Sequence, residues 1–85
     1  MHESGVVADL MRRVEKESKD AGRVSRVTLR VGALAGLDAH SLRHGVEHYA
    51  EERWGYLPEV VVERSTDPTK PDAQGVVLVS IGVGP

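Results

Sequence analysis

The sequence predicts a single α/β domain of the α+β type, in which two helices pack on one face of a three-stranded mixed sheet. Three observations lead to this prediction. The length of 85 residues fits one domain with a thin core. Hydrophobic residues make up 40% of the chain, which suffices for a small globular fold. Their spacing alternates between the helical and the strand period, in the order α-β-α-β-β.

The first element is a predicted helix over residues 4–21. Its apolar residues recur at spacings of three and four, which leaves one face for the core. The opposite face is charged, includes Glu15, and is expected to lie in solvent. Gly22 follows at a position that suits a left-handed residue at the end of a helix.

The second element, residues 23–31, has the period of a strand. Val27 and Leu29 alternate with polar residues, which is typical of a strand with one buried face. A connector of small residues follows over 32–37, and Asp38 then lies where the N-cap of a helix is expected.

The remaining elements are a helix over 39–54, a strand over 59–64, a polar loop over 65–74 and a strand over 75–83. The helix between the first two strands allows them to run parallel, whereas the loop allows the last two to form an antiparallel pair. The last strand carries no charge, which implies either a covered central position or an edge that pairs.

Composition excludes several classes of function. The absence of cysteine removes disulfides, thiolate zinc sites and cysteine nucleophiles. Eleven basic and thirteen acidic residues give no electrostatic reason to expect nucleic-acid binding. No segment resembles a signal peptide or a membrane span, so a cytoplasmic protein is expected. We do not expect an enzyme, because no nucleophile motif or phosphate-binding glycine loop is present.

The N-terminal residues Met1, His2 and Glu3 are a candidate metal site. A free α-amine titrates near pH ~7.7–8.0, so a divalent ion can displace its proton. This amine, the His2 imidazole and backbone amides would form a planar, nitrogen-rich site that suits Ni(II) or Cu(II). Glu3 would orient His2 or neutralise charge. The alternative is that His2 is an ordinary exposed residue near the terminus.

A second candidate metal site lies on the second predicted helix. His40, His44 and His48 recur every four residues, so they share one stripe of the helix within reach of one ion. Glu47 or Glu51 would complete a nickel or zinc site there. The alternative is a solvated face, because the stripe lies opposite the apolar side of the helix.

The N-terminal tripeptide, Arg26-Val27, the segment 31–37, Leu42-Arg43 and Glu47 together resemble the HypA family of nickel metallochaperones in hydrogenase maturation. The resemblance runs to about residue 64. It implies a cytoplasmic, non-enzymatic protein that hands nickel to the large subunit of a nickel–iron hydrogenase with a partner GTPase.

The resemblance also implies how nickel is bound. The family uses the N-terminal amine, backbone amides and the imidazole of the second residue, here Met1 and His2, with support from Glu3. Asp38 matches an aspartate proposed to approach the metal in some members. The alternative role for Asp38 is that of a plain helix N-cap.

One departure from the family concerns zinc. Typical members carry a zinc domain with two CxxC pairs between the last two strands, whereas residues 65–75 form only a short loop without cysteine. We therefore expect one nickel-binding domain over residues 1–85 and no structural zinc. The alternative function is a metal-free interaction module that docks a maturation GTPase, a hydrogenase subunit or a second copy through the final strand.

Overall fold

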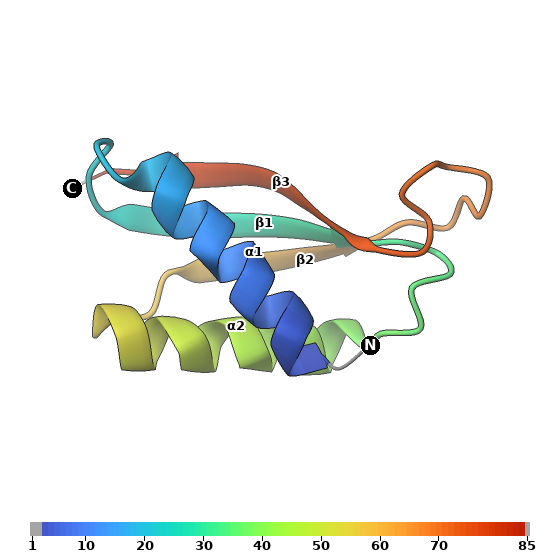
Figure 1. Ribbon diagram of the computed structural model, residues 1–85, viewed down its shortest axis with the longest axis horizontal. Helices are drawn as coiled ribbons and strands as arrows, with labels where there is room; N and C mark the ends of the chain where they lie inside the picture. Colours follow the sequence, from blue (N-terminus) through green and yellow to red (C-terminus); the bar gives the residue numbers. More distant parts are fainter. Residues whose placement is uncertain (1–2, 85) are drawn as a thin grey trace.

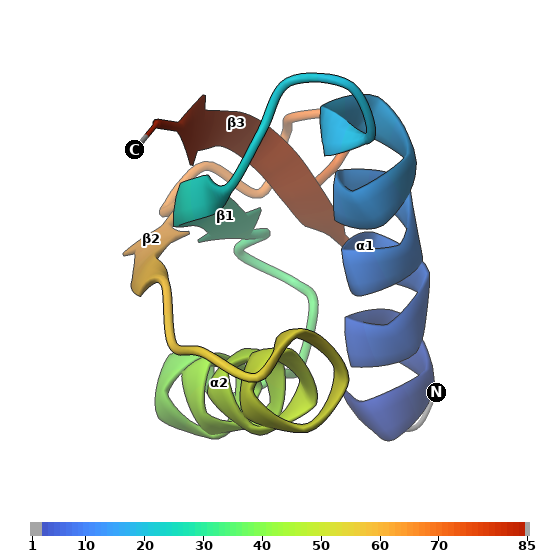
Figure 2. The same cartoon turned by 90° about the vertical axis from the view of Figure 1, so that its left-hand side faces the viewer.

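The computed structural model describes residues 3–84 and has the predicted α+β fold. Both helices lie on one face of the sheet, which leaves the other face uncovered (Figures 1 and 2). The elements follow in the order α1 (Glu3–Ser18), β1 (Val24–Val31), α2 (Ala39–Trp54), β2 (Glu59–Arg64) and β3 (Val76–Val83). In this part of the chain neither helix combines the length and the apolar character needed to cross a membrane.

The sheet has the strand order β2-β1-β3, so β1 is the central strand. β1 pairs in parallel with β2, as predicted, and antiparallel with β3. The prediction that the last two strands pair with each other is therefore wrong, because they lie at opposite edges. The loop between them crosses the end of β1: the Ser65 N–H donates to the Val31 carbonyl, and the Gly32 N–H donates to the Gly75 carbonyl.

The core lies between the sheet and the helices. β1 contributes most to it because this strand is flanked by a strand on each side and covered by helices on one face. Burial of these apolar side chains is the main term that stabilises a domain of this size. The largest fully buried side chains are Met11 and Val14 of α1, Val27 and Leu29 of β1, and Leu42 and Val46 of α2.

The end of α1 differs from the prediction by three residues. The helix ends at Ser18, whose buried hydroxyl donates a 2.7 Å hydrogen bond to the Val14 carbonyl one turn earlier. Such a bond satisfies the hydroxyl inside the core and competes with continuation of the helix. Gly22 has the expected left-handed conformation, with φ 104°.

The two helices approach closely where Val7 of α1 meets Gly45 of α2. A Cβ atom placed on Gly45 would lie 2.9 Å from the Val7 Cγ2 atom, closer than van der Waals contact allows. Glycine at this position therefore permits the crossing, and it brings the first turns of α1 against the middle of α2.

Candidate metal centre

Of the predicted N-terminal nickel residues, only Glu3 belongs to the part of the chain that the structure describes. Met1 and His2 fall outside the described residues, and Glu3 is the first residue of α1. α1 begins at the same end of the molecule as α2 (Figure 1). The assignment of Met1, His2 and Glu3 to a metal site stays a prediction.

Asp38 acts as the N-cap of α2. One carboxylate oxygen accepts a 3.1 Å hydrogen bond from the His40 backbone N–H, and the other accepts a 3.3 Å bond from the Ser41 hydroxyl. The bond from His40 satisfies a backbone donor that the helix itself leaves free. Helix capping therefore accounts for an aspartate at position 38. A role of Asp38 as a nickel ligand stays a prediction.

The histidine stripe of α2 is exposed along its whole length. The rings of His40 and His44 lie edge to face with centroids 4.4 Å apart, and His48 Nε2 lies 3.2 Å from an oxygen of Glu52. Among the side chains that the structure describes, no group of three or more histidine, aspartate or glutamate residues is placed to hold a metal ion. The structure brings two of the three histidines together, and a metal site at this stripe stays a prediction.

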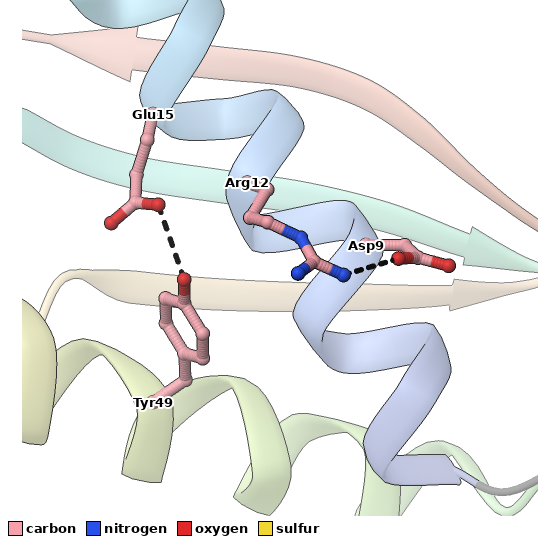
Figure 3. Close-up of polar contacts among 4 residues, drawn as sticks. All are labelled: Asp9, Arg12, Glu15 and Tyr49. Atoms are coloured by element: carbon pink, nitrogen blue, oxygen red, sulfur yellow. Dashed lines mark hydrogen bonds and ion pairs between the residues drawn. The ribbon is translucent and has the colours of Figure 1, made fainter.

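A shallow groove of about 550 Å³ runs beside α1. Its apolar wall comes from Val6 and Leu10, and its far side comes from the connector before α2 and the start of β3. Asp9 lies at the rim and accepts a 2.7 Å bond from Arg12 on the same helix (Figure 3). The charge of Asp9 is therefore already paired. The groove is open to solvent and does not resemble an enclosed substrate pocket.

The environment of Glu15 differs from the prediction. Glu15 is half-buried between the helices rather than on a solvated face. One carboxylate oxygen accepts a 3.1 Å hydrogen bond from the Tyr49 hydroxyl (Figure 3), and the other accepts a 2.8 Å bond from Trp54 Nε1. A signal for this contact was present in α2, because buried Tyr and Trp side chains usually find a partner for their polar atoms.

The contact with Glu15 affects the ionisation of Tyr49. Burial raises the pKa of Tyr49 above its usual value of 10.0, and the hydrogen bond to Glu15 and the charge of Glu15 raise it further. The nearby Arg53 and Arg12 guanidinium groups lower the pKa, as smaller effects. The phenol is therefore neutral at physiological pH and acts as the donor that joins α2 to α1.

The fold and the described side chains define a small α+β domain with an exposed histidine stripe on α2 and an open groove beside α1. A family model described as "Hydrogenase/urease nickel incorporation, metallochaperone, hypA" matches residues 1–70. The chain belongs to this HypA family.

A solved structure has the same fold. The solution structure of the Ni metallochaperone HypA from Helicobacter pylori is similar, with a TM-score of 0.76 and 17% sequence identity. The similarity covers 98% of this chain and 97% of the other. At this identity it shows the shared fold alone. No curated protein sequence matches the chain.

Proposed function

We propose that the chain binds nickel at its N-terminus and assists nickel insertion during maturation of nickel–iron hydrogenase. The observation that carries the proposal is the family match over residues 1–70, which includes the tripeptide Met1-His2-Glu3. Nickel is then the cargo of the protein. A partner GTPase, the hydrogenase large subunit as recipient and a cytoplasmic location are part of the same proposal and rest on the family resemblance.

The start of α1 supports this chemistry. The first N–H groups of a helix have no partner within the helix, so the amides near Glu3 are free of that constraint. The Met1 amine, the His2 imidazole and these amides would together offer nitrogen ligands to Ni(II). Each ligand must lose or lack a proton to bind metal, so affinity for nickel should fall as the pH is lowered.

We expect His2→Ala to abolish tight nickel binding without changing the fold, because the imidazole is the only side-chain nitrogen in the proposed site. Residues added before Met1 should also abolish tight nickel binding, because they convert the free amine of Met1 into a peptide nitrogen. Titration of the untagged chain with Ni(II), followed by absorption spectroscopy, measures both effects. Planar coordination would produce d–d bands that an octahedral complex would not match.

The matched control is the variant in which His40, His44 and His48 are all replaced by alanine. It removes the same kind of ligand from the exposed stripe of α2 and should keep the planar nickel signal. Tight binding that survives both His2→Ala and the N-terminal extension would overturn the proposed site. If the triple variant bound fewer nickel ions per chain while both N-terminal changes had no effect, the metal would instead be assigned to the stripe.

A further inference from the structure

A hollow of about 360 Å³ lies at the end of the molecule where both helices end (Figure 1). Ser18, the last residue of α1, and Trp54, the last residue of α2, both line it. Glu15 and Tyr56 are also part of its wall. The hollow shares no lining residue with the groove beside the start of α1, and it contains none of the proposed nickel ligands.

The charge of Glu15 has no cationic partner in this hollow. Both of its hydrogen bonds come from neutral donors, the Tyr49 hydroxyl and the Trp54 indole N–H. In the described part of the chain, Glu15 takes part in no ion pair. The two oxygens of an ionised carboxylate offer about four acceptor positions, so Glu15 can still accept hydrogen bonds from a cation.

Two aromatic rings lie at the same hollow. The ring centroids of Trp54 and Tyr56 are 5.9 Å apart, with an angle of 36° between the ring planes. The Tyr56 hydroxyl accepts a 3.1 Å hydrogen bond from the Val24 N–H, which fixes this ring against β1. The faces of tryptophan and tyrosine rings attract cations, and arginine is the cation found there more often than lysine.

The chain itself already places a guanidinium on one of these rings. The central carbon of the Arg23 guanidinium, Cζ, lies 3.8 Å from the centroid of the Tyr56 ring. The two helix ends add to the attraction, because the last carbonyl groups of a helix carry partial negative charge and favour cations. A carboxylate, aromatic faces and two helix C-termini thus all favour positive charge at this place.

We propose that the hollow binds the guanidinium of an arginine side chain presented by another protein. The guanidinium would donate to the unused acceptor positions of Glu15 and stack against the indole of Trp54. Arginine suits this site better than lysine, because its planar group keeps its charge and binds carboxylates and aromatic rings at the same time.

The shape of the site favours an arginine carried by a larger partner over a free small molecule. Pockets for small molecules usually bury most of the ligand, whereas this hollow is open to solvent on one side. An arginine that enters from a partner needs to bury only the end of its side chain. Lys19 lies exposed at the rim and does not pair with Glu15, so the cation of the chain itself leaves the carboxylate available.

Titration of the full chain with a Gly-Arg-Gly peptide blocked at both ends, followed by NMR, tests the proposal. The indole N–H of Trp54 gives one identifiable resonance, because the chain has a single tryptophan, and we expect this resonance to shift and saturate. The same peptide with citrulline in place of arginine keeps the planar group without its charge. It should bind roughly tenfold more weakly.

Variants of the chain test which residues bind the guanidinium. Glu15→Gln removes the charge but keeps one acceptor oxygen, and it should raise the Kd of the arginine peptide by roughly tenfold. The matched control is Glu17→Gln, the same change at an exposed position of the same helix, which should leave the Kd unchanged. Lys19→Ala should lower the Kd, because it removes a positive charge from the rim. Circular dichroism of the variants confirms that they are folded.

Several outcomes would overturn the proposal. The absence of a saturable shift with the arginine peptide is one, and equal binding of the citrulline peptide is another. The comparison of these peptides uses the unchanged chain, so it does not depend on the folding of a variant. Equal effects of Glu15→Gln and Glu17→Gln would also contradict the site.

The source of the guanidinium has a separate test. Ethylguanidinium carries the same group without a peptide, and it should bind more weakly than the arginine peptide because it lacks contacts from a backbone. Equal Kd values would overturn the assignment to a partner protein and leave a free guanidinium compound as the ligand. All of these titrations are made without metal, so their outcome is independent of the proposed function.

Discussion

At the scale of single residues, Glu15 shows how a charged side chain can join two helices. Its two carboxylate oxygens receive the polar atoms of Tyr49 and Trp54, which both come from α2. Hydrogen bonds to a charged acceptor are stronger than hydrogen bonds between neutral groups. A half-buried donor that loses its acceptor lowers the stability of the folded state. Glu15 therefore stabilises the packing of α2 against α1, although its neighbours on α1 are typical surface residues.

We expect Glu15→Ala to lower the free energy of unfolding by about 1–2 kcal/mol, since two partly buried donors lose their acceptor. The emission of Trp54, the only tryptophan, should shift to longer wavelength as its indole becomes more hydrated. Urea denaturation followed by fluorescence measures both effects.

The control for this prediction is Glu17→Ala on the same helix. Glu17 is exposed, and its one polar contact is a 3.2 Å ion pair with Arg13. An exposed pair of this kind contributes about 0.3–0.5 kcal/mol. Equal effects of the two substitutions would show that Glu15 does not hold the helices together.

At the scale of elements, local signals placed the helices and strands well. α2 has the predicted bounds because Asp38 caps its start and Gly55 ends it with φ 78°. β1 has the predicted buried face because its alternation of apolar and polar residues is a property of the strand itself. The crossing of α1 and α2 at Gly45 could not be predicted in this way, because it depends on a residue 38 positions away, Val7.

Two glycine substitutions distinguish the effect of the helix crossing on stability from the effect of helix propensity. Gly5→Ala in α1 should raise the free energy of unfolding by about 0.5–1 kcal/mol, because a Cβ there meets nothing within 4 Å. Gly45→Ala should lower it by about 1 kcal/mol net, because overlap with the stiff Val7 side chain outweighs the gain in propensity. Thermal or urea denaturation measures both changes.

The double variant Val7→Ala, Gly45→Ala provides the check on this explanation. With the Val7 methyl groups removed, the alanine at position 45 has room, so its effect should become neutral or stabilising. If Gly45→Ala destabilises the chain equally in both backgrounds, the close approach of the helices is not the cause.

At the scale of the whole molecule, the central position of β1 determines how the last third of the chain is arranged. The two ends of the loop over residues 65–75 both bind the end of β1, through Val31 and Gly32. Ala73 is buried, and its carbonyl accepts a 2.7 Å bond from the Leu34 N–H. The loop is thus anchored at both ends, while residues 66–71 are exposed.

This anchoring predicts where the fold tolerates an insertion. Eleven Gly/Ser residues added between Thr69 and Lys70 would double the loop and should lower the free energy of unfolding by only about 0.6 kcal/mol. The same insertion between Ala73 and Gln74 separates the two backbone bonds to Leu34 and Gly32, and should cost about 1–3 kcal/mol more. Urea denaturation of the two variants measures the difference. Equal losses at both positions would contradict the anchoring.

The sequence by itself determined the number, order and approximate bounds of the elements, and it carried the family resemblance that the family match supports. These properties are local, because periodicity, caps and short motifs depend on neighbouring residues.

Only the tertiary structure decided that β1 lies between β2 and β3, that Glu15 accepts bonds from α2, and that β3 is left with a free edge. Each of these depends on segments far apart in the chain, and more than one strand order satisfies the same pattern of apolar residues. The choice among these orders follows from how the side chains fill a shared core and how the loop at 65–75 is anchored across the end of β1.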